Sequence, residues 1–257
     1  MNAVLTVLGS GTSMGVPTIG CQCLVCTSSD PHDRRTRPSI MLEYGGRCVL
    51  IDTTPDFRAQ AIRERITRLD AVLYTHAHAD HILGLDDVRP LSFKSAEKIP
   101  LYAHPATASA VERIFKYIFD AEYKYGGIAR VQMNHINGAL DLFGAHFESI
   151  PILHGDAEIH GFRFGKAAYL TDFSEIPASS MERLRDLDVL FLDALRHKPH
   201  PTHSTVANSL RVVAELQPKR AFFTHISHDL PHEETNNGFP ENVRLAHDGL
   251  KLEFEIA

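Results

Sequence analysis

The sequence predicts an α/β or α+β protein in which two packed β-sheets are covered by helices on their outer sides. Short apolar segments bounded by glycines recur along the chain, and segments with helical character separate them. Strand-like segments predominate at both ends of the chain, and many are spaced for antiparallel pairing. With 257 residues and 44% hydrophobic content, the chain can bury one sizeable core. We expect a single domain over 1–257, because neither a repeat nor a linker divides the sequence.

Apolar runs and turn residues together place the individual elements. Gly45-Gly46 closes a hairpin, 53–56 begins a helix that reaches about Ile66, and Pro177 begins a helix that reaches about Leu187. Further helices are expected over 84–91, from 104 onward and over 204–215. Strands are expected over 3–8, 39–44, 47–51, 71–75, 99–103, 139–143, 146–152, 159–164, 167–170, 189–192, 220–223 and 250–256.

Two segments carry less specific patterns. The glycine-rich loop over 9–17 either cradles a phosphate with its N–H groups or forms a plain turn, and we favour the turn. Residues 105–135 include a run of aromatic side chains, among them Tyr117, Tyr123 and Tyr125. An aromatic helix of this kind is either part of the core or a lid over a site.

The charge pattern argues against some classes of function. Lys and Arg number 26 against 32 Asp and Glu, which gives a net charge of −6 without a long run of one sign. A general nucleic-acid binder is therefore disfavoured, because nothing draws a phosphate backbone over a wide surface. No apolar stretch approaches the length of a membrane span, and the N-terminus lacks a charged-then-apolar leader. We expect a soluble, cytoplasmic protein that makes no membrane contact.

A dense histidine motif, His76-Ala77-His78-Ala79-Asp80-His81, follows the apolar run 70–75. A tight loop at a strand end can aim its three imidazoles and one carboxylate at a single point. Imidazole and carboxylate ligands suit zinc, manganese or iron. The alternative is a polar loop that is merely rich in histidine, but only a metal easily explains so many potential cations side by side.

Three of the four cysteines lie close together at Cys21, Cys23 and Cys26. A Cys-x-Cys pair does not easily close on itself as a disulfide, and the cluster holds an odd number of thiols. In an intracellular chain such a cluster indicates a metal before a disulfide, with free thiols as the alternative. Cys48 lies in an apolar run and is expected in the core.

Polar residues also follow apolar strands later in the chain, at His154, Asp172, Asp193 and His225. A single buried histidine is more often satisfied by hydrogen bonds than bound to a metal. The recurrence of such residues together with the histidine motif is hard to obtain by chance, so we expect strand ends to collect these side chains.

The order His-x-His-x-Asp-His, a lone His, Thr-Asp and a late His resembles that of the metallo-β-lactamase fold hydrolases over nearly the full chain. The resemblance implies a four-layered αβ/βα sandwich with two divalent ions, manganese or zinc, at one edge of the sheets. It implies that Asp52 holds the metal-binding loop in place without itself binding a metal. The implied ligands are His76, His78 and His154 for the first ion, Asp80, His81 and His225 for the second, and Asp172 as a bridge between them.

A narrower resemblance is to the phosphoribosyl 1,2-cyclic phosphate phosphodiesterase family of phosphonate breakdown. It is carried by the cysteine cluster and by His225-Ile226-Ser227-His228. It implies a structural zinc, held in a loop over about 20–38 by Cys21, Cys23, Cys26 and His228, and a closed Cys₃His set is typical of such sites. It also implies His203 as general acid, with His197 and His200 as close competitors.

The function implied is hydrolysis of a small cyclic phosphate ester such as phosphoribosyl 1,2-cyclic phosphate. A metal-bound hydroxide attacks phosphorus and His203 protonates the leaving oxygen, so we expect His203 and Asp80 to be the catalytic residues. Arg196 and His200 are expected to bind the substrate phosphate, on position alone. The partner is then a small phosphorylated sugar or nucleotide-like molecule, without nucleic acid, and the resemblance implies a homodimer.

Alternative functions stay open on the same scaffold. A ribonuclease Z-like RNA-processing nuclease uses the same metals, but the acidic net charge and the lack of a basic arm oppose it. A non-hydrolytic binding role resembles that of the cofactor-synthesis protein for pyrroloquinoline quinone, and the full ligand set argues against it. An iron-dependent oxidoreductase is a further option, because ligands do not fix the metal. The stretch 107–135 does not obviously match the phosphodiesterase family.

Overall fold

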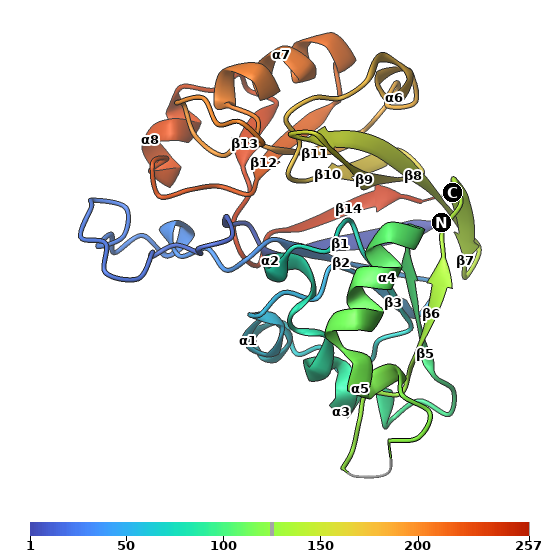
Figure 1. The fold of residues 1–257 in the computed structure, drawn as a ribbon. Helices are drawn as coiled ribbons and strands as arrows, with labels where there is room; N and C mark the ends of the chain where they lie inside the picture. The colour runs from blue at the N-terminus through green and yellow to red at the C-terminus, as the bar shows by residue number, and fades with distance from the viewer. Residues whose placement is uncertain (124–125, 257) are drawn as a thin grey trace.

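The computed structural model describes residues 1–123 and 126–256. In this part of the chain two seven-stranded sheets pack face to face, and helices cover their outer faces (Figure 1). The predicted α/β sandwich of the metallo-β-lactamase type is confirmed.

The first sheet has the strand order β14-β1-β2-β3-β4-β5-β6. Its strands pair antiparallel from β14 to β3 and parallel from β3 to β6. Gly45 and Gly46 form the predicted hairpin turn with positive φ angles of 54° and 71°, which glycine adopts without strain. The strands are β1 (Asn2–Gly9), β2 (Ser39–Tyr44), β3 (Arg47–Ile51), β4 (Ala71–Leu73), β5 (Ile99–Ala103), β6 (Val131–His135) and β14 (Lys251–Glu255).

The second sheet repeats this arrangement with the order β13-β12-β11-β10-β9-β8-β7. Its strands pair antiparallel from β7 to β10 and parallel from β10 to β13. The carboxyl ends of the parallel strands of each sheet therefore share an edge. The strands are β7 (Ala139–Leu142), β8 (Ala145–His154), β9 (Ala157–Phe164), β10 (Ala167–Leu170), β11 (Val189–Asp193), β12 (Arg220–Thr224) and β13 (Val243–Leu245).

The helices divide between the two outer faces. Those of the first half are α1 (Phe57–Arg63), α2 (Ala79–Ile82), α3 (Arg89–Ser92), α4 (Pro105–Ile114) and α5 (Lys116–Phe119), with 3₁₀ turns η1 (Pro31–Asp33) and η2 (Leu85–Val88). Those of the second half are α6 (Ala178–Glu182), α7 (Val206–Leu216) and α8 (His232–Asn237). Among the described residues, none of these helices is long and apolar enough to cross a membrane.

The structure departs from the sequence expectations in several elements. The helices α1 and α6 end at Arg63 and Glu182, earlier than the apolar pattern indicates. The strands β6 and β13 and the helix α8 were not expected from the sequence pattern. β6 is an edge strand with Gln132 and Asn134 in it, so its residues are too polar to show a buried strand's pattern.

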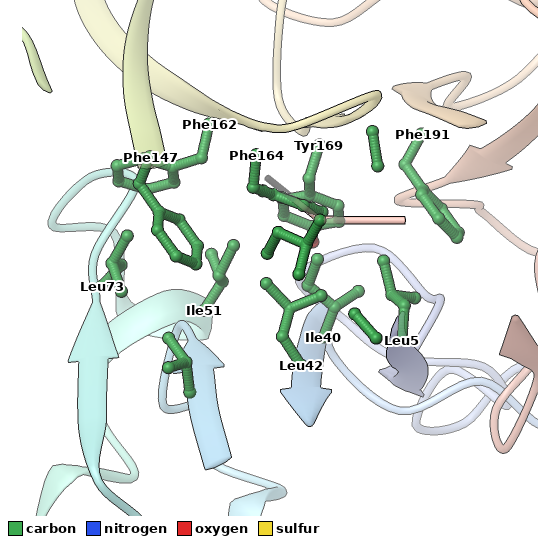
Figure 2. Packing of buried hydrophobic residues seen from close by; sticks show 14 of the residues in the cluster. Leu5, Ile40, Leu42, Ile51, Leu73, Phe147, Phe162, Phe164, Tyr169 and Phe191 are labelled. Atoms are coloured by element: carbon green, nitrogen blue, oxygen red, sulfur yellow. The ribbon is translucent and has the colours of Figure 1, made fainter. Parts of the chain in front are cut away.

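The two sheets meet in one apolar core. Leu5, Leu42 and Ile51 of the first sheet face Phe147 and Phe164 of the second, and all are fully buried (Figure 2). The rings of these two phenylalanines lie 5.7 Å apart, within the range in which aromatic pairs attract. This core holds the sheets in one relative position, which fixes where the strand ends lie.

The segment that follows β5 packs against the first sheet. Val111, Phe115 and Ile118 are buried in a separate apolar cluster between α4, α5 and this sheet. The rings of Tyr117 and Tyr123 lie edge to face on the partly exposed side, with centroids 6.2 Å apart. Tyr125 lies outside the described residues. The inner side of both helices is therefore core.

The glycine-rich loop after β1 is a turn that packs against other segments of the protein. The N–H groups of Ser10, Gly11 and Thr12 donate to Asp248 Oδ1, Thr36 O and Ile226 O at 2.9, 2.8 and 3.1 Å. A Cβ at Gly11 would lie 2.7 Å from a backbone oxygen, so the close packing requires glycine. Because these N–H groups already have acceptors, a phosphate cradle at this loop is not supported.

The inter-sheet core generates a stability prediction. Phe147→Ala removes a fully buried ring and leaves a cavity, so we expect the free energy of unfolding to fall by about 3–5 kcal/mol. Urea denaturation measures the change. The control Ile62→Ala alters a side chain that is 61% exposed and should change stability by less than about 0.5 kcal/mol. Equal losses in the two variants would contradict this account of the core.

Candidate metal centre

The ends of strands from both sheets converge at one edge of the sandwich. His76 to His81 follow β4, His154 ends β8, Asp172 follows β10 and His225 follows β12. The hairpins and crossovers of the fold thus bring together side chains that are up to 149 residues apart in the chain (His76 to His225). These are the residues that the sequence nominated as metal ligands.

Three residues at these strand ends have an unusual backbone conformation. Asp52, Asp172 and His225 have φ angles of 67°, 61° and 55°. Residues other than glycine seldom adopt this left-handed region, and each such residue costs on the order of 1–3 kcal/mol. The conformation turns the chain sharply after the strand and directs the side chain into the site.

The candidate ligands form two adjacent groups. In each group the possible ligand atoms all lie within 4.8 Å of one another. The first group is His76, His78 and His154, and the second is Asp80, His81, Asp172 and His225. His78 is exposed and the other six are buried, so the centre is open to solvent on one side only.

The carboxylate of Asp172 lies between the two groups. Its Oδ1 is 3.4 Å from His81 Nε2, and its Oδ2 is 3.2 Å from His225 Nε2. The same Oδ2 is 3.9 Å from Nε2 of His76, in the first group. Asp172 thus belongs to the second group and also approaches His76 of the first, so it is the candidate for the bridge that the family resemblance implies.

Hydrogen bonds fix the orientation of several ligand rings. Asp52 Oδ2 accepts a hydrogen bond from His81 Nδ1 at 2.8 Å, and the same carboxylate accepts from the backbone N–H and hydroxyl of Thr75 at 2.9 and 2.8 Å. His154 Nδ1 donates to Thr202 O at 2.7 Å. Because Nδ1 is used in both histidines, Nε2 is the atom left for a metal.

The chemistry of the cluster fits a pair of divalent cations. Four buried atoms that face the interior have no hydrogen-bond partner within 1–123 and 126–256: Nε2 of His76, His81 and His225, and Oδ2 of Asp80. Burying a polar atom without a partner is costly, and a cation held among these atoms removes that cost. Imidazole with carboxylate is a donor set that zinc and manganese accept.

The electrostatic field of the centre also favours positive charge. Burial opposes a charge on His225, yet the carboxylates of Asp172 and Asp80 raise its pKa to about 9. Burial likewise opposes the ionised form of Asp172, yet His225 and His81 hold the pKa of this carboxyl well below its ordinary range. The carboxylates therefore stay ionised at neutral pH and attract cations to this point.

The three clustered cysteines and His228 meet beside this centre. The Sγ atoms of Cys21, Cys23 and Cys26 lie 3.2, 3.4 and 3.4 Å from Nδ1 of His228. Sulfur and nitrogen ligands of a tetrahedral zinc are about 3.6 Å apart, so the four atoms are arranged to within a few tenths of an ångström for such an ion. The backbone N–H of Cys26 lowers the pKa of Cys23 to about 6, which favours a thiolate ligand.

A buried arginine ties this cysteine loop to the loop that follows β12. The guanidinium of Arg35, which is 1% exposed, donates to the carbonyls of Ser227 and Leu230 at 2.9 and 2.7 Å and to Asp33 at 3.0 Å. Ser227 lies between His225 and His228 in sequence. The sequence did not identify this role, because only the folded chain shows that Arg35 is buried.

His203 faces the candidate metal centre and is oriented by Asp193, a residue to which the sequence assigned no role. Nδ1 of His203 donates to Asp193 Oδ2 at 2.8 Å, and Asp193 is fully buried. The His203 ring stacks on that of His225 with centroids 4.6 Å apart. Burial and the neighbouring His225 lower the pKa of His203 to about 4, so the ring is neutral at neutral pH. The free Nε2 atom is the one available for proton transfer.

The two residues expected to bind phosphate differ in whether they contact His203. His200 is beside His203, with ring centroids 5.0 Å apart, and its Nδ1 accepts a hydrogen bond from the Thr202 hydroxyl at 3.2 Å. The guanidinium of Arg196 instead donates to carbonyls of its own loop, at Lys198 and Pro199. The structure therefore brings His200 to the centre and shows no contact between Arg196 and the centre among the described residues.

Comparison with known proteins agrees with this geometry. Residues 47–226 match the model of the β-lactamase superfamily domain. The chain belongs to the metallo-β-lactamase superfamily. A solved diphosphatase described as belonging to the PhnP family has 62% sequence identity over 100% of this chain and 98% of its own, with a TM-score of 0.95. The predicted membership of this superfamily of metal-dependent hydrolases is confirmed, and the similarity to a PhnP-family structure is in line with the narrower resemblance.

A more distant solved structure agrees in fold, and a curated relative agrees in sequence. Zn²⁺-bound PqqB from Methylobacterium extorquens has 20% identity and a TM-score of 0.78 over 97% of this chain and 99% of its own. An octanoyltransferase from Porphyromonas gingivalis is 36% identical over 95% of this chain and 50% of its own length. The chain spans about half the length of the curated relatives it matches, so their names describe longer proteins.

The bridging geometry predicts the effect of removing one carboxylate. Asp172→Asn removes the negative charge that lies between the two groups, so we expect the purified protein to lose the ions of the dinuclear centre and to keep the structural zinc. Elemental analysis after dialysis measures this. Asp188→Asn, at an ion pair with Lys219 on the surface, is the matched control and should leave the metal content unchanged. Full retention of metal by the Asp172 variant would exclude the bridge.

The cysteine cluster predicts a second, separable loss. Cys23→Ala should abolish binding of the structural zinc and lower the melting temperature by at least about 5 °C, because a structural zinc contributes several kcal/mol and each kcal/mol shifts a domain of this size by about 2–4 °C. Cys48→Ala, outside the cluster, should keep its zinc. A zinc content that is the same in both variants would show that the thiols are free.

Proposed function

We propose that this protein is a dinuclear metal-dependent phosphodiesterase that hydrolyses a small phosphorylated sugar or nucleotide-like ester, with cyclic ribose phosphates as the leading class. The observation that carries the proposal is the position of Asp172 between two groups of ligands, which suits two cations that share one substrate. When bound, such ions supply Lewis acidity and a water activated at neutral pH.

The chain's own ligands account for the choice of a phosphate ester. Five histidines and two carboxylates hold the ions, so the centre keeps enough positive charge to accept an anionic phosphate. His78 is the exposed member, which makes its side of the centre the approach for substrate. His200 lies beside His203, with ring centroids 5.0 Å apart, and is the residue that we expect to contact the phosphate. Arg196 contacts the phosphate only after its guanidinium has given up its hydrogen bonds to the carbonyls of Lys198 and Pro199.

His203 moves the proton that the reaction requires. Asp193 holds the hydrogen of Nδ1, which fixes the tautomer and aims Nε2 at the centre. Because the resting ring is neutral, its Nε2 first accepts the proton that the attacking water releases and then donates this proton to the departing oxygen. The buried carboxylate of Asp193 stabilises the cationic ring between these two events. This extends the expected role of His203 as general acid.

A second candidate substrate is a diphosphate, since the relative with 62% identity is named a diphosphatase. The two classes differ in the leaving group. An alkoxide leaves with difficulty unless it is protonated, whereas a phosphate group leaves easily without an acid. The role of His203 therefore separates the candidates: its position beside the centre is of most use to an enzyme that cleaves an ester of a sugar hydroxyl.

The remaining alternatives are less well supported. A ribonuclease Z-like activity would need a basic surface for transfer RNA, and the net charge of −6 opposes it. A salt-sensitive gel shift with structured RNA would overturn this ranking.

The cysteines form no disulfide, which suits a reducing compartment, so we propose that the enzyme acts in the cytoplasm.

The proton-transfer role generates the test of the proposal. His203→Ala should lower kcat about 10²–10⁴-fold on an alkyl or cyclic ribose phosphate and less than about 10-fold on a p-nitrophenyl ester, whose leaving group needs no proton. The metal content should stay unchanged. His197→Ala, an exposed neighbour in the same loop, is the matched control. Equal losses on both esters would contradict the acid, and activity on diphosphates alone would replace the substrate class.

A further inference from the structure

A second cluster of potential metal ligands lies away from both sites described above. His104, Glu158 and His160 place one ligand atom each within 4.8 Å of the others, the same spacing found in each group of the dinuclear centre. His104 follows β5 of the first sheet and begins α4, whereas Glu158 and His160 lie on β9 of the second sheet. Glu158 and His160 are two residues apart on a strand, so they project from the same face.

The two imidazoles are packed against each other. The rings of His104 and His160 are stacked with centroids 4.4 Å apart and planes inclined by 21°. Nε2 of His160 is 3.9 Å from Oε1 of Glu158, too long for a hydrogen bond. Within 1–123 and 126–256, the rings of His104 and His160 stack on no histidine of the dinuclear centre. None of the nitrogens of these two rings makes a hydrogen bond in this part of the chain.

The environment of His160 keeps a lone pair available. Its side chain is 9% exposed, and burial, with His104 and Arg183 nearby, lowers its pKa to about 4. The ring is therefore neutral at pH 7. The positive charge of Arg183 is balanced by Glu148, to which its Nε donates at 2.7 Å. Neither ring nitrogen of His160 is among the fully buried polar atoms of the described residues, so the ring keeps access to solvent and a lone pair that a cation can reach.

We propose that His104, Glu158 and His160 form a third site for a divalent transition metal of the zinc type. Two imidazoles and one carboxylate are a common three-ligand set for zinc, and a water completes the tetrahedron on the side where Glu158 is exposed. The ion joins the two sheets, because its ligands come from β5–α4 on one side and from β9 on the other.

This site has a direct link to the histidine motif. The backbone N–H of His160 donates to the carbonyl of Thr75 at 3.2 Å, and Thr75 immediately precedes His76. A metal that fixes His160 therefore also restrains the start of the metal loop. We expect occupation of the site to stabilise the fold and to leave the ligands of the dinuclear centre in place.

The test uses the full chain with its structural zinc and its dinuclear centre loaded. Zinc is added in excess, weakly bound metal is removed by gel filtration, and zinc is counted per chain. We expect His104→Gln to bind one zinc fewer than the unmodified protein, with an affinity at this site reduced at least about 100-fold. His146→Gln is the matched control, because it alters a surface histidine that pairs with Asp141 at 2.7 Å.

Two further measurements keep the proposal falsifiable. Crystals of the zinc-loaded protein should show an anomalous scattering peak at the edge of the His104 and His160 rings, about 2.1 Å from one nitrogen of each and in the plane of each ring. The zinc-dependent rise in melting temperature should be smaller in His104→Gln than in His146→Gln. Glu158→Gln, which alters an exposed side chain, should weaken the site if His104→Gln fails to fold. An equal zinc count in His104→Gln and the unmodified protein, or no peak at this place while the other sites are filled, overturns the proposal.

Discussion

The hydrogen bonds of the buried Asp52 carboxylate are the interaction on which the candidate metal centre depends. One side chain at the end of β3 accepts hydrogen bonds from the N–H and hydroxyl of Thr75 and from the ring of His81. It therefore fixes both the beginning and the end of the histidine motif. Burial raises the pKa of Asp52, and the bonds from its neighbours to the ionised form oppose that shift. The metal loop is held in place by the protein itself, so ligand positions are largely set by the folded chain.

Contacts within the folded chain also explain how the two candidate metal sites share a short segment. His225 and His228 are three residues apart and point to different sites, one to the dinuclear centre and one to the cysteine cluster. Arg35 fills the space beside this segment and bonds to its backbone. The cysteine loop projects from the side of the sandwich in Figure 1, yet it is anchored at the point where the site needs rigidity.

Local sequence patterns predicted the parts of the site that are local. The histidine motif and the cysteine cluster are each contained in six residues, and His154, Asp172 and His225 each follow an apolar strand. Parallel strands place their carboxyl ends at one edge, which is why these scattered residues could be expected to meet.

Other features depend on contacts that the sequence does not display. The pairing of Asp193 with His203 requires the path of the loop between them, and the role of Arg35 requires its burial among distant carbonyls. β6 and α8 are too polar to carry a strand or helix period, and they form because the sheet edge and the neighbouring loop give them partners. Tertiary structure overrides weak local preference at these places.

The left-handed backbone at Asp52, Asp172 and His225 has a consequence for how this scaffold can diversify. Branched and bulky side chains are poorly tolerated in that conformation, and glycine, which suits it, has no ligand atom. The repertoire at these corners is therefore narrow, essentially Asp, Asn and His. New substrate preferences are more accessible through the exposed part of the loop over 197–201, which ends before Thr202 and His203 and contains none of the candidate metal ligands.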